Sequence, residues 1–269
     1  MQMQPRSGTP NNPSATVNTK STWLLVRGLY RQQRHWEAFP SQLALQLNSQ
    51  VLCGDIAGTG REWHATTPSS ITGIMLRLRN TFRQQHPDVS YPIRLLGISM
   101  GGMICSEWAK HFPNEIQRMV FINTSFKHFS PIYQRLKPHN IPTLLKVLTR
   151  SPLQQEQAIL TMTSYSQHSH SHQALAQRWA NYAAQQPVSR QNALRQLYAA
   201  SRFSPPAHPP IKAILLLAST QDKLVDVRCS TAIATRWRCP IHYHPIAGHD
   251  LPLDDGSWVC QKIVDWLAE

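Results

Sequence analysis

The sequence predicts an α/β fold: a mostly parallel, doubly wound sheet with helices on both faces and a helical insertion. Short apolar runs alternate with segments of helical periodicity along most of the 269 residues. These runs are uninterrupted rather than alternating, which is typical of strands buried on both faces. From about Ser125 to Pro210 no strand-like run occurs, and helical patterns are separated by prolines.

Six apolar runs predict the strands, each ending near a loop-forming residue. In chain order they are Trp23–Val26, Val51–Cys53, Ile93–Leu96, Met119–Ile122, Ile211–Leu217 and Ile241–Ile246. Helical spacing fills the gaps between them, with serines before one helix and Pro113 after another. The helices predicted in these gaps are Phe39–Leu47, Ile71–Phe82, Met103–Phe112, Ser230–Trp237 and Trp258–Leu267.

The chain divides into a tail, a core and an insertion. Residues 1–20 are polar and rich in Pro, Asn, Ser and Thr, so we expect a disordered tail without a secretory signal peptide. Residues 21–125 and 211–269 form the α/β core, and residues 126–210 form a helical cap. The helices predicted in the cap are Thr143–Leu148, Leu153–Met162, Ala174–Ala184 and Asn192–Ala200.

Composition narrows the class of protein. The net charge of +13 favours acidic partners, but the arginines are scattered and no nucleic-acid motif is present, so we expect no nucleic-acid partner. Five cysteines without a CxxC pair indicate buried thiols in a reducing cytoplasm. The apolar runs are too short to span a bilayer.

The run Ile93–Leu96 leads into Gly97-Ile98-Ser99-Met100-Gly101, which matches G-x-S-x-G between a strand and a helix. In that context the glycines allow a sharp turn, and the serine hydroxyl stands above the sheet edge. The alternative is a glycine turn that only packs the helix against the strand. Ser99 is therefore the candidate nucleophile, and it needs a histidine and a carboxylate to activate it.

Two later strand ends supply those partners in the order acid, then histidine. His249 follows the last strand and precedes the last helix, whereas His242 and His244 lie within the strand. Asp222 is the first carboxylate after the strand Ile211–Leu217, with Asp226 as the alternative. The tract His168–His172 lacks a nearby Cys or carboxylate, so we expect no metal site there, and no cofactor.

The oxyanion of the reaction needs two N–H donors. We expect them to be the backbone of Met100, after the serine, and of Leu29, in the loop after the first strand. Aromatic and aliphatic cap residues are candidates for the substrate lining, with packing inside the cap as the alternative for each. They are Tyr133, Leu144, Leu148, Met162, Tyr165, Trp179 and Tyr182.

Over roughly residues 20 to 269 these motifs together resemble the α/β-hydrolase superfamily, and among its members small capped serine esterases of the kind that act on pimeloyl-carrier-protein methyl ester. The resemblance rests on Gly97–Gly102, Asp222 in D-x-L-V and Gly248-His249. It also rests on Asp55-x-x-Gly58-x-Gly60, and on Arg27-Gly28 where the family usually has His-Gly. Only the polar segment precedes Trp23, so we expect one or two N-terminal strands of the family's sheet to be missing.

The leading hypothesis is a cytoplasmic serine hydrolase that cleaves carboxylic esters or thioesters with Ser99, His249 and Asp222. The alternative is a protein on the same fold that binds a small molecule or acyl carrier without efficient turnover. Basic residues in the first part of the cap suit an acidic acyl carrier, or they form an ordinary solvated face: Arg135, Lys137, Lys146 and Arg150.

Overall fold

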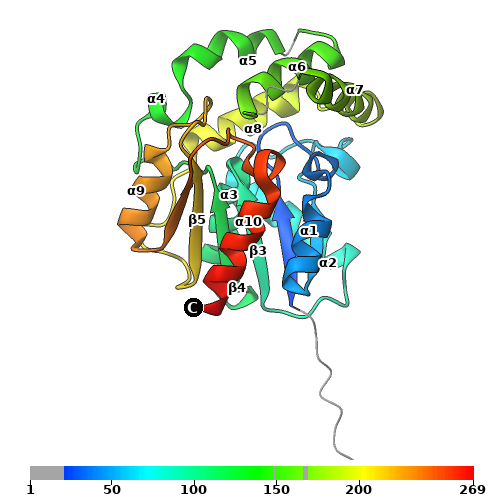
Figure 1. The fold of residues 1–269 in the computed structure, drawn as a ribbon. Helices are drawn as coiled ribbons and strands as arrows, with labels where there is room; N and C mark the ends of the chain where they lie inside the picture. Colours follow the sequence, from blue (N-terminus) through cyan, green and yellow to red (C-terminus); the bar gives the residue numbers. More distant parts are fainter. Residues whose placement is uncertain (1–20, 148, 166–168) are drawn as a thin grey trace, which may run out of the picture.

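The computed structural model describes residues 21–147, 149–165 and 169–269. Within them, six parallel strands form one sheet in the order β2-β1-β3-β4-β5-β6 (Figure 1). The strands are β1 (Thr22–Val26), β2 (Gln50–Gly54), β3 (Ile93–Ile98), β4 (Ile116–Ile122), β5 (Ile214–Ser219) and β6 (Ile241–His244). The predicted fold class is confirmed. The predicted tail, residues 1–20, and the position of Leu148 lie outside the described residues.

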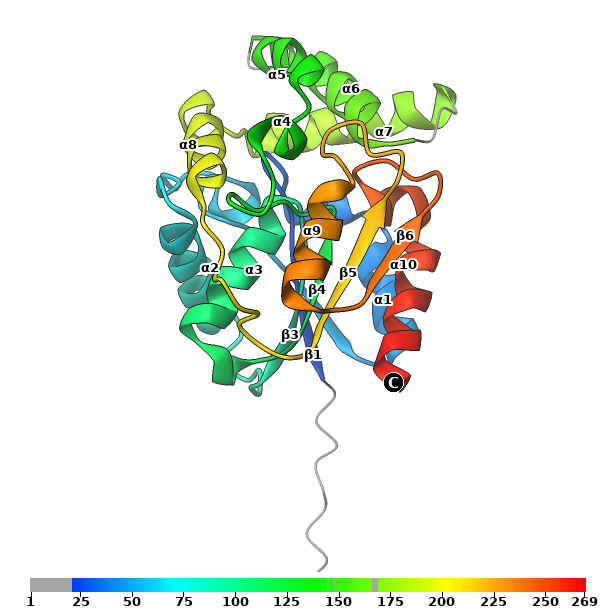
Figure 2. The ribbon, with the colours of Figure 1, turned by 90° about the vertical axis from the view of Figure 1, so that its left-hand side faces the viewer.

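Helices cover both faces of the sheet because successive residues of each buried strand point to opposite sides. Leu24, Leu95 and Phe121 pack on one side with helices α2 (Ile71–Gln85), α3 (Met100–His111) and α9 (Arg228–Trp237). Leu25, Leu96 and Val120 pack on the other side with α1 (Phe39–Leu47) and α10 (Leu251–Ala268). Figure 2 shows α1 and α10 on the opposite side of the sheet from α2 and α3.

Several helices begin earlier than the sequence predicts, and two of these follow Ser99 and His249 in the chain. Helix α3 starts at Met100, directly after Ser99, where two glycines hide the helical pattern. Helix α10 starts at Leu251 and is kinked at Asp255 (φ −152°, ψ 76°), so its first turn does not continue the periodicity that begins at Trp258. Strand β5 starts at Ile214 rather than Ile211.

Between β4 and β5 the described residues form five α-helices, which we call the inserted helices. They are α4 (Ile132–Arg135), α5 (Ile141–Val147), α6 (Pro152–Thr163), α7 (Ser169–Gln185) and α8 (Arg190–Arg202). Both ribbon views place them over the carboxyl ends of the strands. The described part of residues 126–210 contains no strand, as predicted, and the four-residue helix α4 was not predicted.

The carboxyl end of a parallel sheet is where ligands bind, at the point where strand order reverses. Here the chain runs from β1 to β2 on one side and then to β3 on the other, so β1 and β3 flank that point. The loops after these two strands carry Gly28 and Ser99. No helix of the described residues is both long enough and apolar enough to cross a membrane.

Gly101 provides a test of the packing beneath this edge. A Cβ at Gly101 would collide with the backbone oxygen of Val26, and neither backbone segment can move without shifting β1 or α3. We expect Gly101→Ala to lower the free energy of unfolding by about 2–3 kcal/mol, measured by urea denaturation. Gly256→Ala is the control, because its Cβ would meet the flexible end of Gln42 and the edge of the Phe39 ring at 3.2 Å, and no backbone atom. Equal stability of the two variants would contradict this packing.

Candidate active site

Ser99 occupies the sharp turn between β3 and α3 in a conformation that L-residues rarely adopt (φ 56°, ψ −121°). Two hydrogen bonds stabilise this strained conformation. The Ser99 N–H donates to the Ile122 carbonyl at 2.9 Å, and the Thr124 hydroxyl donates to the Ser99 carbonyl at 3.2 Å. The serine side chain is thus presented above the sheet edge, and the first turn of α3 lies directly behind it.

The loops after β5 and β6 bring Asp222 and His249 together. The Asp222 Oδ2 lies 2.6 Å from the His249 Nδ1, and both side chains are buried. Because an ionised carboxylate only accepts hydrogen bonds, this contact assigns a proton to Nδ1, so in a neutral imidazole Nε2 is left as the acceptor. The other carboxylate oxygen accepts from the N–H groups of Leu224 and Val225 at 2.8 and 2.9 Å.

The alternative acid, Asp226, lies elsewhere. Its carboxylate accepts from the backbone N–H of Arg228 at 2.9 Å and pairs with that residue's guanidinium at 2.7 Å, at the start of α9. It therefore serves as a helix-start carboxylate. Asp222, not Asp226, contacts the histidine.

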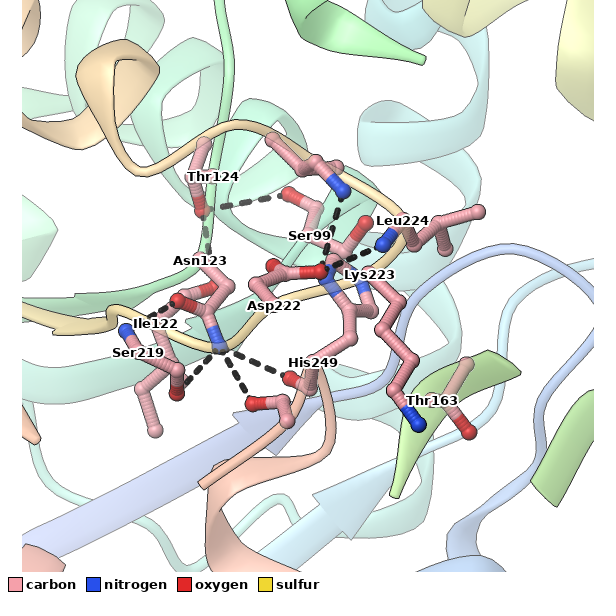
Figure 3. A network of polar contacts seen from close by, with 12 residues as sticks. Ser99, Ile122, Asn123, Thr124, Thr163, Ser219, Asp222, Lys223, Leu224 and His249 are labelled. Atoms are coloured by element: carbon pink, nitrogen blue, oxygen red, sulfur yellow. Dashed lines mark hydrogen bonds and ion pairs between the residues drawn. The ribbon is translucent and has the colours of Figure 1, made fainter. Parts of the chain in front are cut away.

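The buried Asn123 side chain joins three of these loops at the end of β4 (Figure 3). Its Nδ2 donates to the His249 carbonyl at 2.8 Å and to the Ser219 hydroxyl at 3.0 Å, and its Oδ1 accepts from the Ser219 N–H at 2.8 Å. Both ends of the amide are used. These hydrogen bonds fix the distance between the loop that carries Asp222 and the loop that carries His249.

The loop after β1 approaches the serine closely. A Cβ at Gly28 would lie 3.1 Å from the Ser99 Cβ, so only glycine allows this approach without displacement. The next residue, Leu29, lines the same cavity as Ser99. Tyr30 follows with φ 66°, and its N–H donates to the side-chain oxygen of Gln196 on α8 at 3.0 Å. A buried polar residue of the inserted helices thus anchors this loop.

Arg27 and Asp250 form a buried, two-bonded ion pair next to the histidine. The two hydrogen bonds measure 3.0 and 2.6 Å, and both side chains are 4% exposed. The guanidinium also stacks on the Trp36 ring, 4.6 Å from its centroid. Asp250 is therefore turned away from the Nδ1 of His249 and is neutralised by Arg27.

A second buried pair joins the β1 loop to the inserted helices. Arg31 lies 2.5 Å from Glu156 of α6 and stacks on Trp179 of α7. His35 packs edge-on against the same Trp179 ring, at 4.7 Å between centroids. Burial, aided by the charges of Arg31 and Arg27, lowers the pKa of His35 well below its ordinary value of 6.5.

Ser99 and His249 open onto one cavity of about 140 Å³ beneath the inserted helices. Its wall is mainly aliphatic, and α5, α6 and α8 contribute most of it: Leu144, Leu145, Val147, Ile159, Met162, Ala193, Leu194 and Leu197. An apolar cavity of about this size holds a benzene-sized molecule. The volume suits a short acyl chain or an aryl group.

The structure corrects part of the predicted lining. Leu144 and Met162 lie in the cavity wall, but four aromatic residues do not. Tyr133 and Tyr165 are exposed at the surface. Trp179 is fully buried in a cluster of apolar side chains of α6 and α7, and Tyr182 packs against that cluster. Aromatic residues at helical spacing bury more area against other helices than a small cavity offers. Leu148 lies outside the described residues.

Several residues of the site were not found from the sequence. Asn123 cannot carry the negative charge of an acid, so the search for a carboxylate excludes it, although a polar residue directly after a buried strand signals a role at the sheet edge. Gln196 had no local signal, because its partner lies 166 residues away along the chain. Within the described residues, no group of three or more His, Cys, Asp or Glu residues is placed to hold a metal ion.

Comparison with known proteins agrees with this architecture. A family model described as serine aminopeptidase, S33, matches residues 19–255. A search of curated proteins found no similar sequence.

Similar solved structures include several esterases. An esterase from Exiguobacterium antarcticum superposes with a TM-score of 0.73 and 14% identity, over 93% of each chain. A thermophilic esterase from Thermogutta terrifontis has a TM-score of 0.70 and 18% identity, over 93% of this chain and 90% of that one. A lipase-esterase related protein from Clostridium acetobutylicum has a TM-score of 0.69 and 14% identity, over 93% and 96%. At these identities the likeness concerns the fold.

The Arg27–Asp250 pair can be tested by a double-mutant cycle. We expect Arg27→Met to lower the free energy of unfolding by about 3–5 kcal/mol, because it leaves the Asp250 carboxylate buried without a counter-charge. Arg27→Met combined with Asp250→Asn should recover most of that loss in urea denaturation. If the two substitutions simply add, the pair is not energetically coupled.

Proposed function

The chain belongs to the serine aminopeptidase S33 family, a hydrolase family of the α/β-hydrolase superfamily, and from this membership we propose that it cleaves carboxylic esters or thioesters through an acyl-enzyme. One observation carries the proposal: the strained Ser99 and the His249–Asp222 pair open onto the same apolar cavity. Nucleophile, base and orienting carboxylate are the parts that acyl transfer requires.

In the proposed mechanism Ser99 Oγ attacks the acyl carbonyl while Nε2 of His249 accepts its proton. Asp222 holds the imidazole in the tautomer that leaves Nε2 free to do so. The backbone N–H groups of Met100 and Leu29 stabilise the oxyanion. His249 then protonates the leaving alcohol or thiol, and water, activated by the same histidine, releases the acid.

The charges of the cavity favour an ester over an amino-terminal peptide. An aminopeptidase must bind the cationic amino group of its substrate, which requires a free carboxylate. Asp250 is the one carboxylate in the described wall of the cavity, and Arg27 already pairs with it. Arg31, which also lines the cavity, is paired with Glu156, so no unpaired carboxylate of the described wall remains to bind an ammonium group. A panel of p-nitrophenyl esters of rising chain length, acyl-thioesters and aminoacyl-anilides would rank these substrates.

Ser99→Ala tests the proposed chemistry directly. We expect it to lower kcat for p-nitrophenyl ester hydrolysis by about five orders of magnitude, because no other group can form the acyl-enzyme. It should also abolish labelling by a fluorophosphonate probe. Ser106→Ala is the control, since Ser106 lies on the same helix and its buried hydroxyl has no hydrogen-bond partner in the described structure.

Wild-type turnover in Ser99→Ala would overturn the proposed mechanism. If the wild-type protein binds ligands but neither turns over any ester nor reacts with the probe, the protein is a binder on the hydrolase fold.

Gln196→Met tests the role assigned to the loop after β1. The substitution keeps the volume but removes the acceptor of the Tyr30 N–H, so Leu29 loses its fixed position. We expect kcat to fall about tenfold, with a smaller change in KM, because the proposed oxyanion contact acts chiefly in the transition state. Gln191→Met, on the exposed side of the same helix, is the matched control. An unchanged kcat in Gln196→Met would exclude this coupling.

A further inference from the structure

An exposed apolar surface surrounds the entrance of the cavity. On α5, Ile141 and Leu145 are 44% and 62% exposed, and they are four residues apart, on one face of the helix. On α8, Leu194, Leu197 and Tyr198 are 52%, 39% and 52% exposed at the same kind of spacing. We call these five residues the entrance surface.

The entrance surface is continuous with the cavity. Leu145, Leu194 and Leu197 are at once exposed and part of the cavity wall, so they form its rim. The inserted helices therefore present large aliphatic side chains to solvent at the entrance of the cavity. A scattered exposed leucine needs no explanation, but a cluster at the entrance of a site indicates an interaction.

The charge around the entrance surface has one sign. Residues 126–210 contain nine lysines and arginines against one carboxylate, Glu156. Glu156 is buried and paired with Arg31, so it does not offset the surface charge. On and beside α5 and α8 the exposed basic residues are Lys146, Arg150, Arg190 and Arg202. Among the described residues none of these four pairs with a carboxylate.

We propose that the entrance surface docks on a lipid bilayer that contains anionic lipid. Aliphatic and tyrosine side chains enter the boundary between headgroups and acyl chains, while the surrounding lysine and arginine residues bind lipid phosphates. An acidic protein would satisfy the charge but would not account for the five exposed apolar side chains of the entrance surface. Docking in this orientation opens the cavity toward the membrane, so an acyl substrate can enter without crossing water.

Sedimentation with vesicles tests the docking without turnover. The full chain should bind vesicles of phosphatidylglycerol and phosphatidylcholine and bind those of phosphatidylcholine alone much more weakly, with affinity falling as salt rises. Ser99→Ala should bind as well as the wild type, so a failed docking proposal and a failed catalytic proposal give different results. No binding to the anionic vesicles would overturn the docking.

Two sets of variants separate the apolar from the charged contribution. Leu145→Ser with Leu197→Ser should weaken vesicle binding about tenfold, and Leu45→Ser, 84% exposed on α1, should not. Lys146→Glu with Arg190→Glu should weaken it about tenfold or more, and Lys212→Glu, before β5, should have little effect.

If the leucine variant binds vesicles like the wild type, or if polyglutamate is bound as tightly as the anionic vesicles, the surface recognises charge alone. In that case an acidic protein is its partner, and the docking proposal is wrong.

Discussion

The geometry of the site depends on one buried side chain, the amide of Asn123. Its two ends bond to the β5 terminus through Ser219 and to the backbone of His249, so the loops of Asp222 and His249 are held by the same group. These loops come from strands at one side of β4, while Ser99 comes from the strand at its other side. The end of β4 therefore contributes to the positions of all three residues of the proposed triad.

The inserted helices and the segment between α4 and α5 do more than cover the sheet, because the loops after β1 and β5 are bonded to them. Lys137 donates to the Asp222 carbonyl at 2.6 Å, and Asn140 donates to the Lys223 carbonyl at 2.8 Å. Gln196 holds the Tyr30 N–H, and Glu156 pairs with Arg31. Groups buried in this way are costly to leave unpaired. A shift of α6 or α8 would therefore displace the loop after β1, which lies beside Ser99.

The charge inside the cavity differs from the charge on the surface around it. Within the cavity wall the carboxylate of Asp250 is neutralised, and most of the remaining surface is aliphatic. Outside it, residues 126–210 carry one of the chain's 14 acidic residues and nine of its 27 lysines and arginines. A neutral acyl group suits the first environment, and an anionic surface suits the second. Both features lie on the same two helices, α5 and α8.

The sequence by itself determined the fold class and the order of strands and helices along the chain, because apolar runs are local patterns. It also indicated Ser99 and His249 as candidates, with Asp222 or Asp226 as the acid, because G-x-S-x-G and the ends of the predicted strands can be located in the sequence. Only the tertiary structure decided that Asp222 rather than Asp226 meets the histidine, that Arg27 pairs with Asp250, and that Gln196 holds the β1 loop. It also moved Trp179 and Tyr182 from the cavity into the packing of the inserted helices. Such contacts join residues far apart in the chain, and their choice depends on packing and burial that no local pattern records.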